Sequence, residues 1–167
     1  MFENEPVSAF PNITEITFES ISKKFLKVIL LNASFLFFII LIGLISADYF
    51  NLFEELNRYF NLYYGVFIVV FSLGVLLNFL GFKKRKYAVR EKDISYKSGL
   101  FFKKLTTVPF SRVQHIEIDE KPVSRLFGLA ALSVYTAGDS SDDLVIKGIT
   151  KERALQIKEF ISIKINE

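Results

Sequence analysis

The stretch VILLNASFLFFIILIGLISA, residues 28–47, contains 20 consecutive residues without a charge. As a helix it would be about 30 Å long, the thickness of the hydrocarbon core of a bilayer. A second uncharged run covers the 24 residues from Tyr59 to Phe82. Buried helices of soluble proteins rarely contain such long apolar runs. A cleaved signal peptide is not expected, because the first run exceeds the usual apolar core and about 27 residues precede it. The sequence therefore predicts two transmembrane helices.

The composition of the 167-residue chain supports a membrane protein and excludes several kinds of chemistry. Hydrophobic residues make up 51% of the chain and charged residues only 23%, with a mean hydropathy of +0.34. The absence of Cys rules out disulfides, iron–sulfur clusters and thiolate zinc sites, and the single His leaves no poly-His metal site. A net charge of +3 is too small to indicate nucleic-acid binding. No cofactor, metal site or nucleic-acid partner is expected.

Basic residues predict the orientation of the two helices. The loop between them, residues 48–58, holds only Arg58, together with Asp48, Glu54 and Glu55. The positive-inside rule then places both termini in the cytoplasm and this loop outside, in a bacterial cytoplasmic membrane. The basic residues that determine this topology flank the other ends of the two runs: Lys23, Lys24, Lys27, Lys83, Lys84, Arg85 and Lys86.

Neither run contains a charged residue or a His, so an ion pump or proton-coupled transporter is not expected from this chain alone. Asn32 and Asn78 lie at similar depth in an antiparallel pair. We predict that they, or Asn78 and Ser34, face the seam between the helices. The alternative is that lipid head groups solvate the two amides.

The chain divides into an N-terminal segment (1–24), a transmembrane hairpin (25–82) and a C-terminal domain (83–167). From residue 87 onward, short alternations of apolar and polar residues recur about every ten residues, which is typical of a small antiparallel β-domain. Residues 122–128 predict one helical turn that Pro122 opens and Gly128 closes. Thr150 is suited to cap a final helix with one apolar stripe, formed by Ala154, Ile157, Phe160 and Ile161. The expected domain is α+β, with six or seven strands and a helix that closes a bent sheet or barrel.

Four segments resemble bacterial PH-like membrane proteins of the YdbS-like family. They are VPFSRVQHI (108–116), PVSRLFGLA (122–130), LSVYTAG (132–138) and GITKE (148–152). With the two apolar runs, the resemblance covers nearly the whole chain. It implies a pleckstrin-homology-like fold: a bent antiparallel barrel of about seven strands capped by a C-terminal helix. Members of this family often occur beside a larger relative with several such domains, which implies a hetero-oligomer.

The residues offer little for catalysis. His115 and Glu117 share one face of a predicted strand, where a satisfied polar pair is more common than an acid–base dyad. The nucleophile-elbow and phosphate-binding motifs are absent. Asp139, Asp142 and Asp143 are too few for a calcium loop and favour a solvated turn. A non-enzymatic protein is predicted.

Two segments are candidates for contact with a partner or with the membrane. Leu100, Phe101, Phe102, Lys103 and Lys104 place an apolar tip next to basic residues, although the same pattern suits ordinary core. Residues 13–21 alternate like a strand that could pair with a sheet edge of this domain or of a partner, with disorder as the alternative. In the loop Arg90–Asp93 the charges cancel, so no specific phosphoinositide site is expected.

Together these features predict a scaffold or assembly subunit at the inner face of the membrane. It would act through homo- or hetero-oligomerisation, with the lipid bilayer as its other partner. The alternative is a subunit of an envelope defence or transport complex whose membrane helices contribute to the path.

Overall fold

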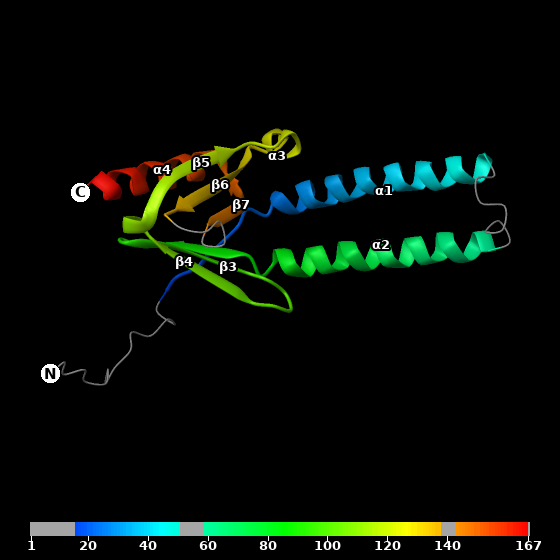
Figure 1. Cartoon of the computed structure of the whole chain (residues 1–167), viewed down its shortest axis with the longest axis horizontal. Helices are drawn as coiled ribbons and strands as arrows, with labels where there is room; N and C mark the ends of the chain where they lie inside the picture. The colour runs from blue at the N-terminus through cyan, green and yellow to red at the C-terminus, as the bar shows by residue number, and fades with distance from the viewer. Residues whose placement is uncertain (1–15, 51–58, 138–142, 167) are drawn as a thin grey trace.

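The computed structural model consists of a long two-helix hairpin with a β-rich domain at one end (Figure 1). It describes residues 16–50, 59–137 and 143–166. The last helix follows the last strand and packs on one side of the β-domain, while the helical hairpin extends away from the strands. The two parts meet where the hairpin has its open end.

The hairpin is formed by α1 (Phe25–Tyr49) and α2 (Phe60–Phe82). Their 25 and 23 residues correspond to about 37 and 34 Å of helix, enough to cross a bilayer. Only 6% of the most apolar window of α1 is buried within the protein, and none of that of α2. These helices therefore are not the core of a soluble domain, because almost their whole apolar surface faces outward.

The first sheet contains four antiparallel strands in the order β1-β2-β3-β4. The strand β1 is only two residues long and pairs through Glu19 with Tyr87 of β2. The N-terminal segment thus does add a strand to the sheet of its own chain, at residues 19–20; residues 13–15 lie outside the described part. The bounds of the strands are β1 (Glu19–Ser20), β2 (Lys86–Val89), β3 (Asp93–Ser98) and β4 (Lys104–Pro109).

The second sheet has three antiparallel strands in the order β5-β6-β7. A 3-10 turn, Phe110–Arg112, leads from β4 into it. The short helix α3 (Pro122–Leu126) begins at its proline and is followed by Gly128 at φ +66°, as predicted. The bounds of the strands are β5 (Val113–Asp119), β6 (Leu129–Thr136) and β7 (Leu144–Thr150).

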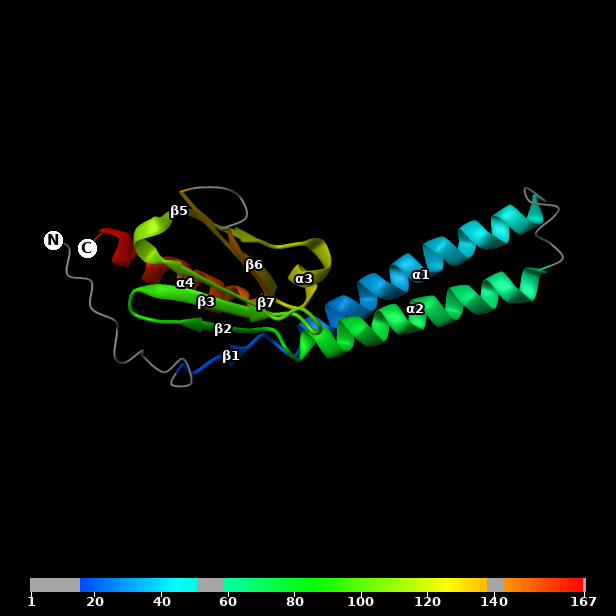
Figure 2. The ribbon, with the colours of Figure 1, turned by 60° about the horizontal axis from the view of Figure 1, so that its bottom comes forward.

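The last helix, α4 (Lys151–Asn166), closes the space between the two sheets (Figure 2). Its first turn is capped as predicted, because the backbone N–H of Arg153 donates to Oγ1 of Thr150 at 3.2 Å. Ala154, Ile157 and Ile161 are fully buried against the strands. Phe160 lies at the rim of this interface and meets the ring of Phe110 edge-on at 6.0 Å.

The predicted architecture of about seven strands and a capping C-terminal helix is confirmed, with one difference. The strands form two separate sheets and do not close into one ring. The ladder is interrupted between β4 and β5, where Pro109 has no N–H to donate and the chain enters the 3-10 turn. Helix α4 fills the open side that this leaves.

Candidate functional site

The base of α1 is part of the core of the β-domain. Ile21, Phe25 and Val28 are buried and belong to the same hydrophobic cluster as the strands and α4. The N–H of Ser22 donates to the carbonyl oxygen of Gly148 at 2.8 Å. Gly148 has φ +84°, and the ring of Phe25 lies so close that a Cβ at this glycine would be 2.7 Å from its Cδ1. The membrane hairpin and the β-domain are therefore one packed unit.

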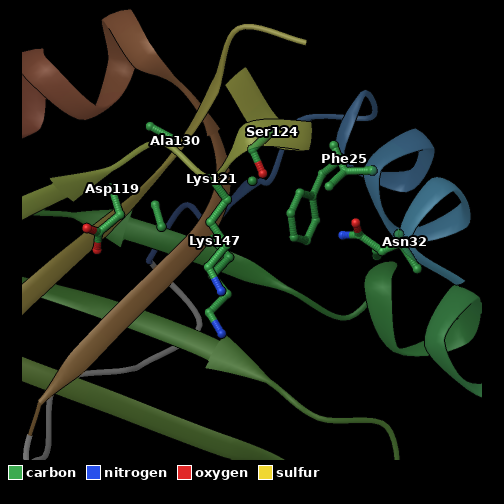
Figure 3. Close-up of a pocket in the computed structure, with 11 residues that line it drawn as sticks. Phe25, Asn32, Asp119, Lys121, Ser124, Ala130 and Lys147 are labelled. Carbon is green, nitrogen blue, oxygen red and sulfur yellow. The ribbon is translucent and has the colours of Figure 1, made fainter. Parts of the chain in front are cut away.

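A small cavity of about 170 Å³ lies beside this junction, between α1 and the second sheet (Figure 3). Asn32 reaches it from α1, and Asp119, Lys121 and Lys147 stand on the side of the strands and α3. The volume suffices for a few water molecules. This cavity lies next to Phe25, at the contact between the base of the hairpin and the β-domain, which we call the joint. Asn32 is the polar residue that α1 contributes to its wall.

The placement of Asn32 and Asn78, or of Asn78 and Ser34, in the helix seam stays a prediction. Asn78 donates to the carbonyl oxygen of Gly74 in its own helix at 3.0 Å. An amide near hydrocarbon needs a hydrogen-bond partner, and the carbonyl four residues earlier supplies one.

Aromatic rings occupy the seam. Phe37 stacks on Phe67 at 5.2 Å and contacts Phe71 at 4.9 Å between ring centroids. Near the far end of the hairpin, Asp48 accepts a hydrogen bond of 2.6 Å from the hydroxyl of Tyr63.

A polar clasp holds β1 against the domain. Arg153 of α4 pairs with Glu19 at 2.6 Å, and the hydroxyl of Tyr87 donates to the same carboxylate at 2.8 Å. Burial raises the pKa of Tyr87, and its hydrogen bond to Glu19 raises it further. The clasp links three elements that are far apart in the sequence: β1, β2 and α4.

His115 and Glu117 lie on the outer face of the second sheet and are half exposed. The imidazole stacks on the ring of Tyr135 at 4.2 Å, and the hydroxyl of Tyr135 donates to Glu117 at 3.1 Å. This hydrogen bond is the main reason that the pKa of Tyr135 is raised. Within the described residues, no group of three or more acidic or imidazole side chains could hold a metal ion. The arrangement is that of a surface cluster on β5 and β6.

The strand β5 is an edge strand. Among the described strands it pairs only with β6, so its other side presents backbone N–H and C=O groups. Gln114, His115, Glu117 and Asp119 are exposed along it. Of the predicted acidic turn before β7, Asp139 and Asp142 lie outside the described residues. Asp143 accepts a hydrogen bond from the N–H of Thr136 at 3.1 Å.

The predicted contact segment lies at the tip of the β3–β4 hairpin. Phe101 is 75% exposed and Phe102 is 93% exposed, so these two rings are not core residues. Leu100 is half-buried, while Lys103 and Lys104 are exposed. The tip lies at the same end of the domain as the base of the helical hairpin (Figures 1 and 2).

The basic residues that predicted the topology gather at this end too. Arg85 is half-buried, with its guanidinium 5.9 Å from the centre of the Phe25 ring. Lys83 lies over the ring of Phe79 at 4.7 Å. The lysines that surround the base of the hairpin are all exposed: Lys23, Lys24, Lys27, Lys83, Lys84 and Lys86.

Comparison with known proteins agrees with this architecture. The model of the bacterial PH domain family matches residues 26–164. The chain belongs to the bacterial PH domain family. Its match begins inside α1 and ends inside α4, so it includes the helical hairpin and every described strand except β1. The resemblance found in the sequence is thereby confirmed.

A curated relative of this bacterial PH domain protein is the UPF0699 transmembrane protein YdbS of Bacillus subtilis (strain 168). The two are 30% identical over 115 residues, which covers 64% of this chain and 70% of the relative. A solved structure, that of a DUF1696 family protein with a pleckstrin-homology domain from Shewanella loihica PV-4, is 16% identical. The superposition covers 48% of this chain and 70% of the other chain, with a TM-score of 0.37. The family match and the transmembrane relative indicate a membrane protein with a PH-like domain, and they point to a non-catalytic role.

Proposed function

We propose that this protein is a membrane-anchored assembly module, whose PH-like domain binds a second copy or a larger PH-like homologue through the free edge of β5. The single observation behind the proposal is that edge: a seven-residue strand with one side unpaired among the described strands, whose side chains are exposed at Gln114, His115, Glu117 and Asp119. Such an edge is a template for antiparallel pairing with another strand.

The packed joint supports this role, because it fixes the height and orientation of β5 relative to the membrane. Copies anchored in one bilayer would then present their edges at the same level. The position of the Lys clusters at the base of the hairpin supports a cytoplasmic location for both termini and for the PH-like domain.

The absence of Cys in the chain allows a direct test by disulfide scanning. Single Cys residues would replace Gln114, His115, Ile116 and Glu117 in turn, with Lys92→Cys in the exposed β2–β3 turn as the control. In a mild detergent, oxidation of at least one β5 variant should give a species of twice the 19.2 kDa chain mass. The control should stay monomeric. A monomer by light scattering, with no cross-link from any β5 position and no larger homologue co-purifying, would contradict the proposal.

Labelling of the Lys92→Cys variant tests the orientation. A membrane-impermeant maleimide should leave it unmodified in intact cells and modify it after lysis. The transport alternative is distinguished by exchanging residues 33–47 and 62–80 for unrelated apolar helices. These segments leave Phe25 and Val28 in place, so the joint is kept. An assembly module should tolerate the exchange, whereas a transport subunit should lose its function.

A further inference from the structure

A basic cleft of about 310 Å³ lies where α2 meets the β3–β4 hairpin. Apart from Ser98 and Gly99, the described residues that line it are all lysines. In the described part of the chain, no carboxylate lines this cleft or forms an ion pair with its lysines. The cleft thus carries five positive charges without a counter-charge, on Lys83, Lys84, Lys86, Lys97 and Lys103.

The backbone forces these charges together. Lys86 and Lys97 are direct partners across β2 and β3, and like charges in such a pair destabilise a sheet. Gly99 has φ +102°, and a Cβ there would overlap the carbonyl oxygen of Phe102. The tight turn that brings Lys103 back to the cleft therefore needs a glycine. A bound anion would relieve the repulsion that this arrangement creates.

The cleft lies at the depth of the lipid head groups. Only residues 83–85 separate the end of α2 from the start of β2. In both views of the ribbon, the β3–β4 tip reaches the level of the end of α2 (Figures 1 and 2). Phe101 and Phe102 project from this tip with most of their surface exposed. Exposed Phe rings next to lysines are typical of segments that lie at the boundary between lipid head groups and acyl chains.

We propose that this surface binds the phosphate of an anionic phospholipid in the leaflet that faces the PH-like domain, while Phe101 and Phe102 enter the edge of the hydrocarbon. Charge selects an anion, and the position beside α2 selects a lipid of the same bilayer. The opposite end of the sheet offers no such site, because Arg90 is paired with Asp93 there. The proposal is independent of assembly through β5.

The first experiment measures the depth of the tip. The chain contains no Trp, so a Phe102→Trp variant has a single reporter. The full chain would be reconstituted in vesicles of phosphatidylglycerol and phosphatidylcholine that carry nitroxide-labelled acyl chains. The emission of the Trp at position 102 should be blue-shifted and quenched by the nitroxide. The Trp of a Lys92→Trp variant, at the far turn, should emit as in water. Equal emission and equal quenching for the two variants would overturn the proposal.

The second experiment tests the lysines. In detergent, short-chain phosphatidylglycerol would be titrated against the full-length Phe102→Trp variant while its emission is followed. Adding Lys97→Gln and Lys103→Gln should weaken binding by about 25-fold, since one lysine near an anionic lipid surface contributes about fivefold. A control that adds Lys92→Gln and Lys158→Gln removes the same charge from distant exposed sites and should bind as before. Equal effects of the two pairs, or equally tight binding of inorganic phosphate, would overturn the proposal.

Discussion

The contact between Gly148 and Phe25 gives the sharpest test of the joint between hairpin and domain. In a Gly148→Ala variant, the new Cβ would lie 2.7 Å from Cδ1 and 2.8 Å from Cβ of Phe25. The left-handed backbone at φ +84° would add about 1–2 kcal/mol of strain for any residue with a side chain. Displacement of the Phe25 ring within a packed core adds about 1–3 kcal/mol. The free energy of unfolding should therefore fall by about 2–5 kcal/mol.

Gly128 supplies a matched control for the backbone term. It also has a positive φ, +66°, but a Cβ there would meet nothing within 4 Å. The free energy of unfolding of Gly128→Ala should therefore fall only by the backbone strain of about 1–2 kcal/mol. Chemical denaturation in detergent micelles, followed by circular dichroism, would compare the two variants.

Combining Gly148→Ala with Phe25→Ala isolates the clash. Phe25→Ala alone should cost about 3–5 kcal/mol, because it removes a buried ring. In that background, Gly148→Ala should cost less than it does beside the Phe25 ring, because only the contact of 2.8 Å with the Cβ of residue 25 remains. If Gly148→Ala costs the same with and without the Phe25 ring, or costs nothing, the two parts do not share a core.

Three further predictions follow from contacts described above. Thr150→Ala should lower the free energy of unfolding by about 1 kcal/mol in the same assay, and Thr150→Ser should restore most of it, because the hydroxyl caps α4; equal stability of all three proteins would contradict this. The raised pKa of Tyr87 means that folding favours its neutral phenol. Its contribution to the free energy of unfolding should therefore be complete below about pH 10 and be lost as the pH rises through the higher pKa of the folded state. Tyr87→Phe should reduce this alkaline loss without removing it, since the pKa of the half-buried Tyr96 is raised as well; an unchanged pH profile would refute the role of Tyr87. Phe37→Ala should weaken the packing of α1 on α2 by at least the stacking contribution of about 0.5–1.5 kcal/mol, and it should lower the resistance of the hairpin to proteolysis. The control Phe35→Ala, on the outer surface, should leave this resistance nearly unchanged.

The features that sequence could predict were those with local causes. The length of the two uncharged runs predicted the two helices. The alternation of apolar and polar residues between turn residues predicted the main strands. Thr150 and the spacing of Ala154, Ile157 and Ile161 identified the last helix. These patterns depend on neighbours within a few residues, so they can be read along the chain.

The missed features depend on pairing between distant segments. Phe25 lies next to a run of apolar residues, and nothing in its surroundings distinguishes a core residue from a lipid-facing one. Its partner Gly148 is more than a hundred positions later. The basic cleft was missed for the same reason, because Lys97 joins the juxtamembrane lysines only through the register of β2 and β3. The stacking of Phe37 on Phe67 was also missed, because it depends on how the two helices are paired.

The sharing of Ile21, Phe25 and Val28 between hairpin and domain also constrains biosynthesis. These residues are synthesised early, whereas the β7 glycine that packs against Phe25 follows both helices in the chain. The N-terminal stem can therefore complete its packing only after the final strands have been synthesised. A soluble fragment that starts after α2 would lack a strand and three core side chains, so it would expose the core surface that these groups cover.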